Sequence, residues 1–180
     1  MFVYVTFSGC FQGRGYTRLT LQLYLNQVLG FSLSDIRWVI SMRVAGMVLF
    51  LFIVGSLSDK YGRKPVLIVG YVISGLGLFA FSLSDNLFLL LLCGLLAGIG
   101  DAFGMSTLLA LLTDIAPSSS REVVVGFYRT FMDIGGFLGP ILFMLVFSSY
   151  SPSTTFYLGA LFMLIDILLV ARVKEPLIEV

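Results

Sequence analysis

Long apolar runs alternate with short polar segments along the whole chain. A helix that crosses a membrane needs about 20 consecutive apolar residues, and this criterion predicts six spans, at residues 2–29, 37–57, 65–84, 87–113, 124–147 and 154–172. The segments between them are short and rich in turn-forming residues, so neighbouring helices are expected to be antiparallel. The runs are unbroken and do not alternate with a period of two, which excludes the strands of a membrane barrel.

The composition places these helices in a membrane. Apolar residues make up 58% of the chain and charged residues 12%. The mean hydropathy is +1.03, beyond the range in which a soluble domain can bury its apolar surface. Apolar runs recur to the end of the chain, so the first of them is not merely a targeting sequence. We therefore predict an all-α integral membrane protein, a single six-helix domain at 1–180 that contacts the lipid bilayer.

The residues that the chain lacks exclude several kinds of chemistry. It has no His, the commonest general base and metal ligand, so the familiar intramembrane serine and zinc proteases are ruled out. Its two cysteines, Cys10 and Cys93, lie within apolar runs and are interpreted as small core residues. There is no nucleotide-binding motif, which argues against direct ATP drive. We expect a protein that is not an enzyme, with no catalytic residue, metal site, cofactor or nucleic-acid partner.

Basic residues set the expected orientation in the membrane. The side reached after the second, fourth and sixth spans carries Lys60, Arg63, Lys64, Arg121, Arg172 and Lys174. The loops on the opposite side carry only Arg37. Because cytoplasmic loops are enriched in Lys and Arg, we expect a multi-pass protein of the cell membrane with both termini and the loop at 58–64 in the cytoplasm.

Glycines recur with the spacing of packed membrane helices. Gly94 and Gly98, Gly100 and Gly104, and Gly135 and Gly139 are each four residues apart. Such pairs let helix backbones approach closely. The spacing predicts that the helices form a bundle.

The segment GSLSDKYGRKP, at 55–65, concentrates charge between the second and third spans. Its distinctive residues are Gly55, Asp59, Lys60, Gly62, Arg63 and Lys64. The pattern G-x-x-x-D-K-x-G-R-K resembles the signature of the major facilitator superfamily, G-x-L-A-D-R-x-G-R-R/K, with Lys60 in place of the usual Arg. The resemblance implies that these six residues form a gating motif that braces one conformational state. The plainer alternative is an ordinary loop whose basic residues fix the orientation.

The resemblance extends over nearly the whole chain. LLAGIGDAFG at 95–104 is similar to the glycine-rich fourth helix of the family, and GFYRTFMDIGGFLGP at 126–140 to its fifth. Complete family transporters have twelve spans in two related halves, so six spans imply one half. Cys93 stands where first halves often have an Arg, and the phrase at 126–140 is more typical of second halves, which favours the C-terminal half.

The resemblance implies a function as well as a fold. We expect transport of a small solute by alternating access, as half of a secondary active transporter, with proton-coupled export or antiport driven by a proton gradient. Such a half needs a second six-helix half, either another copy of this chain or a separate chain. A truncated or accessory membrane protein without transport activity of its own is the alternative.

Ionisable residues inside the spans are the candidate site, because a charge at mid-membrane is costly and usually faces a cavity or a partner. They are Arg14, Arg18, Arg43, Asp101, Arg129, Asp133 and Asp166. Asp101 is the leading candidate for a proton-carrying carboxylate or a substrate contact, or else for an internal salt bridge to Arg14 or Arg18. Arg14 and Arg18 share a helix face that favours anionic solutes, unless they reach instead to the membrane surface.

The remaining intramembrane charges point more to structure than to binding. Arg129 and Asp133 are four residues apart, and we interpret them as an interface charge pair that is either permanent or made in one transport state. Arg43 and Asp166 have no partner at helical spacing in the sequence and are interpreted as structural.

Overall fold

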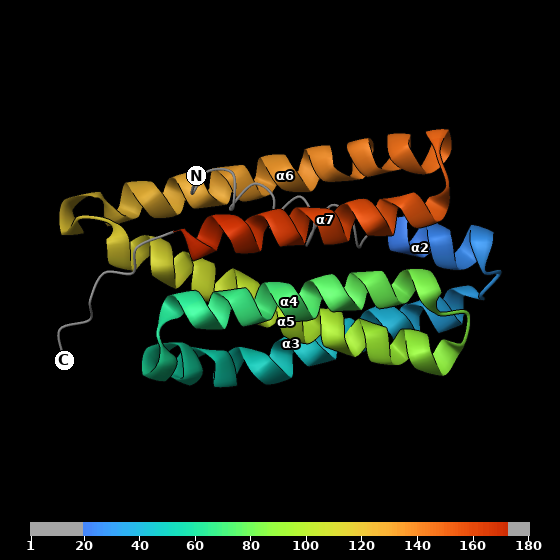
Figure 1. Cartoon of the computed structure of the whole chain (residues 1–180), viewed down its shortest axis with the longest axis horizontal. Helices are drawn as coiled ribbons and strands as arrows, with labels where there is room; N and C mark the ends of the chain where they lie inside the picture. The colour runs from blue at the N-terminus through green and yellow to red at the C-terminus, as the bar shows by residue number, and fades with distance from the viewer. Residues whose placement is uncertain (1–19, 173–180) are drawn as a thin grey trace.

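The computed structural model describes residues 20–172, which form helices joined by short turns (Figure 1). The five long helices are α3 (Leu33–Tyr61), α4 (Arg63–Leu83), α5 (Leu87–Ile115), α6 (Arg121–Ser149) and α7 (Pro152–Ala171). All five are long and apolar enough to cross a membrane. They confirm the all-α class and coincide with the last five predicted spans.

The first predicted span is only partly within the described residues. Its end forms α2 (Leu21–Leu23), which continues as the π-helix η2 (Tyr24–Val28). Residues 2–19 of that span, with Arg14 and Arg18, lie outside the described residues, so a sixth membrane helix stays a prediction. The ring of Tyr24 meets the ring of Phe156 edge to face, with centroids 4.6 Å apart, which joins η2 to α7.

Polar side chains and one glycine determine where the helices begin and end. The Ser32 hydroxyl accepts a hydrogen bond from the backbone N–H of Asp35 at 3.3 Å and caps α3. The Asn86 side chain accepts from the N–H of Phe88 at 2.8 Å and caps α5. Gly62 alone separates α3 from α4 and has φ of +93°, a left-handed conformation that side chains with a Cβ rarely adopt.

The prediction of a loop at 58–64 is wrong. Residues 58–61 continue α3, and Arg63 and Lys64 open α4. Charged residues are compatible with helix ends that emerge from the apolar part of a membrane, so a change in polarity does not mark the end of the helix. The turn between α3 and α4 requires only Gly62.

Helix α5 is the centre of the described bundle. It packs along both α3 and α4, and α4 packs in turn on α7. In Figure 1, α5 passes obliquely behind α4, from beside α3 at its beginning to the start of α6 at its end. A Cβ at Gly98 would collide with the backbone carbonyl of Arg43, and one at Gly94 would lie 2.8 Å from the carbonyl oxygen of Val39. This contact between α3 and α5 confirms the close packing predicted for that glycine pair.

Large apolar side chains cover much of the outside of the bundle. Phe52 on α3, Leu76 on α4, Phe137 on α6 and Leu168 on α7 are all exposed. A soluble protein rarely leaves so much apolar surface open, whereas lipid tails are a suitable neighbour for it. The surface therefore agrees with a bundle that contacts the bilayer.

Candidate functional site

A buried ion pair joins α3 to α5 in the interior of the bundle. The guanidinium of Arg43 donates from Nε to Oδ2 of Asp101 at 2.7 Å, and its Nη2 lies 2.6 Å from the same oxygen. The side chains of Arg43 and Asp101 are 10% and 14% exposed. Removal of either partner alone would leave an uncompensated buried charge, so the two side chains depend on each other.

The geometry of this pair is one-sided. Both contacts from Arg43 reach Oδ2 of Asp101, which leaves Oδ1 outside the pair. On the other side, Nη1 of Arg43 is buried and has no hydrogen-bond partner among the described residues. The ion pair therefore uses only part of the bonding capacity of either group.

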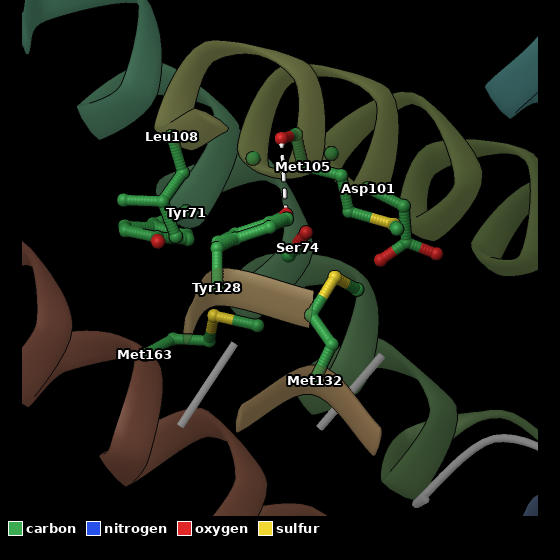
Figure 2. Close-up of a pocket in the computed structure, with 10 residues that line it drawn as sticks. Tyr71, Ser74, Asp101, Met105, Leu108, Tyr128, Met132 and Met163 are labelled. Atoms are coloured by element: carbon green, nitrogen blue, oxygen red, sulfur yellow. Dashed lines mark hydrogen bonds between the residues drawn. The ribbon is translucent and has the colours of Figure 1, made fainter. Parts of the chain in front are cut away.

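Asp101 also lines a pocket between four helices, here called the Asp101 pocket (Figure 2). Its walls include Tyr71 and Ser74 of α4, Met105 of α5, Tyr128 and Met132 of α6, and Met163 of α7. The Tyr128 hydroxyl donates to the backbone carbonyl of Met105 at 3.3 Å. The cavity volume is about 30 Å³, which accommodates water but not a drug-sized solute, whose sites measure about 300–1,000 Å³.

A second polar site lies where α3, α4 and α5 meet at one end of the bundle. Nη1 of Arg63 lies 2.6 Å from Oδ1 of Asp59 and donates to the Ser58 hydroxyl at 2.7 Å. Nε of Arg63 donates to Oδ2 of Asp114 at 3.0 Å. This Arg63 cluster of Ser58, Asp59, Arg63 and Asp114 joins the end of α3, the start of α4 and the end of α5.

The other residues of the predicted gating motif have separate surroundings. Nζ of Lys64 donates to the backbone carbonyl of Ala171 at 2.6 Å and so links α4 to the end of α7. The ammonium of Lys60 lies 5.2 Å from the centre of the Tyr61 ring. A Cβ at Gly55 would have no atom of the described residues within 4 Å, so no close contact among the described helices requires a glycine there.

The remaining intramembrane charges are placed as follows. Arg129 and Asp133 both lie on the exposed side of α6. The ion pairs described above do not include them, so their pairing stays a prediction. Asp166 is fully buried on α7.

Three features of these sites were not predicted from the sequence. One is the pairing of Arg43 with Asp101, and the other two are the contacts of Ser58 and Asp114 with Arg63. The sequence shows no partner for Arg43 at helical spacing, whereas the structure pairs it with Asp101, 58 positions away in the chain. Spacing along one helix reveals only partners three or four residues apart. Asp114 could have been found from topology, because the end of the fourth span returns to the side of the motif at 55–65.

The fold and its buried charges define a polytopic helical membrane protein with a polar site inside the bundle. The family model described as Major Facilitator Superfamily matches residues 3–179. The chain belongs to this superfamily, which confirms the resemblance and the class of membrane transport proteins.

Two curated relatives illustrate the similarity. The quinolone resistance protein NorA of Staphylococcus aureus (strain N315) is 26% identical over 168 residues, which are 92% of this chain and 42% of NorA. The vacuolar membrane amino acid uptake transporter fnx2 of Schizosaccharomyces pombe is 32% identical over 106 residues, 59% of this chain and 18% of fnx2. The chain thus spans less than half the length of either relative.

Proposed function

We propose that this chain is one half of a secondary active transporter that exports a small solute by alternating access, driven by a proton gradient. The observation that carries the proposal is the position of Asp101, which is shared between a buried arginine and a pocket. A carboxylate inside a membrane is costly and marks an ion or solute pathway in many membrane proteins. A second six-helix half would complete the transporter.

The one-sided ion pair suits a group that exchanges a proton. Arg43 holds Oδ2 of Asp101 and stabilises the ionised carboxylate. Oδ1 is left for a proton, a water or a polar group of the solute that reaches the Asp101 pocket. Protonation would weaken the bond to Arg43, so the proton load of Asp101 and the attachment of α3 to α5 are coupled.

The Arg63 cluster suits a gate at the end of the bundle. Arg63 holds three helices together through one guanidinium, and all its acceptors are side chains that can be exchanged for water or headgroups. The proposal is that the cluster stays intact in one transport state and loosens in the other. The orientation of this end toward the cytoplasm is part of the proposal.

Flux through reconstituted vesicles tests the proposed function. The protein is isolated with its second half, a proton gradient is imposed, and movement of a fluorescent quinolone is followed, a probe chosen because NorA is named for quinolone resistance. Gradient-driven flux is expected in the wild type, and Asp101→Asn should abolish it.

Asp85→Asn is the matched control, because Asp85 lies exposed in the turn before α5. This variant should transport like the wild type. Wild-type flux from the Asp101→Asn protein would remove the proposed role of Asp101. No gradient-driven flux in the wild type would favour the accessory alternative.

A further inference from the structure

A groove on the outside of the bundle runs between α4 and α7, here called the outer groove. Its cavity volume is about 210 Å³, several times that of the Asp101 pocket. Val72, Leu76 and Phe79 of α4 and Ala160, Leu164 and Ile167 of α7 line it. No charged side chain is among the described residues that line it, so its chemistry suits a hydrocarbon and not a polar headgroup.

The outer groove opens toward the bilayer. Leu76 and Leu164 on its rim are 63% and 57% exposed, and both α4 and α7 are membrane-spanning helices. The lining residues lie in the middle of these helices. The groove therefore opens at the depth of the acyl chains, within a hydrocarbon layer about 30 Å thick.

Two side chains separate the outer groove from the Asp101 pocket. Tyr71 of α4 and Met163 of α7 line both cavities, and both side chains are buried. Figure 2 shows them on the side of the Asp101 pocket formed by α4 and α7. Whatever fills the outer groove packs against the back of this Tyr71–Met163 wall.

We propose that the outer groove binds one acyl chain of a membrane lipid, and that this chain supports the Tyr71–Met163 wall of the Asp101 pocket. Acyl chains are by far the most concentrated apolar ligand at this depth, so mass action favours them over any dilute solute. Gly75 lines the groove without a side chain, and a Cβ there would lie in van der Waals contact with Met163, 3.4 Å from its Cβ. The inference requires only that α4 and α7 span the bilayer, and it is independent of transport.

Photolabelling from the bilayer tests the site. The full chain is reconstituted with phosphatidylcholine that carries a diazirine in the middle of an acyl chain, irradiated, and mapped by mass spectrometry. Leu76 and Leu164 should be labelled several-fold more than Phe52 of α3, although Phe52 is 83% exposed, because a bound chain stays in contact longer than bulk lipid. Equal or stronger labelling of Phe52 overturns the proposal without any variant.

A substitution that fills the groove provides the matched comparison. Gly75→Leu should reduce the labelling of Leu164 to the level of Phe52. Gly126→Leu on α6 is the control, because a Cβ at Gly126 would have nothing within 4 Å among residues 20–172, and it should leave the labelling unchanged. Labelling of Leu164 that persists in folded Gly75→Leu protein contradicts the binding site.

Shortening the wall tests the second part of the proposal. Met163→Ala should join the two cavities, so that the label reaches Met105 or Met132 in the Asp101 pocket. These residues should remain unlabelled in the wild type. If the label stays confined to the outer groove in the Met163→Ala protein, Met163 is not the wall between the two cavities.

Discussion

The side chains of Arg43 and Asp101 carry opposite charges inside the bundle. Each has few alternative partners there. Their contact through a single carboxylate oxygen fixes the guanidinium against α5. Loss of one member of such a pair typically costs about 3–5 kcal/mol, whereas apolar replacement of both is often neutral or stabilising. The structural and the functional interpretation of Asp101 can therefore be separated by comparing single with double variants.

Asp101→Leu should lower the free energy of unfolding by about 3–5 kcal/mol, and Arg43→Met in the same chain should restore most of it. The buried thiol of Cys93 can report thermal unfolding through its reaction with a fluorogenic maleimide, after Cys10 is replaced by Ser. Under the proposed mechanism, transport should stay absent in the double variant, because the carboxylate at position 101 is gone. A stable double variant that transports at the wild-type rate would reduce Asp101 to a structural partner.

At the scale of elements, the seam between α3 and α5 depends on the missing side chain at Gly98. Gly98→Ala should destabilise the protein by about 1–3 kcal/mol, the usual cost of overpacking, because the new Cβ collides with the backbone carbonyl of Arg43. The reaction of the Cys93 thiol with a fluorogenic maleimide measures this loss of stability as well. Gly126→Ala on α6 meets no neighbour in the part of the chain that the structure describes and should be neutral or slightly stabilising, since Ala favours helix more than Gly does. Equal melting temperatures for the two variants would contradict the close contact.

The apolar pattern was sufficient to locate five helices, because an uninterrupted apolar run of this length has few other solutions in a membrane. It placed the end of the second span near residue 57, whereas α3 continues to Tyr61. Asp59 and Lys60 have polar side chains, yet their backbone remains in the helix. Hydropathy reports the polarity of a side chain and not the conformation of its backbone. The caps and Gly62 mark the true ends more sharply than the change in polarity does.

Spacing within one segment predicted only the local part of the polar sites. The motif at 55–65 was recognised as a unit, and Asp59 and Arg63 form the local part of the Arg63 cluster. Asp114 and Arg43 reach their partners across helix interfaces. Such contacts depend on the rotation and relative height of two packed helices, which a single sequence does not encode in any local pattern.

For the whole molecule, the basic residues predict which end faces the cytoplasm. In a chain whose Cys10 and Cys93 are replaced by Ser, Lys60→Cys should react with a membrane-impermeant maleimide only when the cytoplasmic side is accessible. Asp85→Cys, in the turn at the opposite end of α4, should react in intact cells. The charges in the loops favour this arrangement. The reverse pattern of labelling would contradict it.

The three methionines of the Asp101 pocket have a consequence for selectivity. Met105, Met132 and Met163 come from three different helices and form much of its wall (Figure 2). Methionine side chains are unbranched and change shape at little cost, so they discriminate poorly between solutes of different outline. Under the proposed transport function, a wall of this kind would distinguish small solutes by charge, through Asp101, more than by the outline of their carbon skeleton.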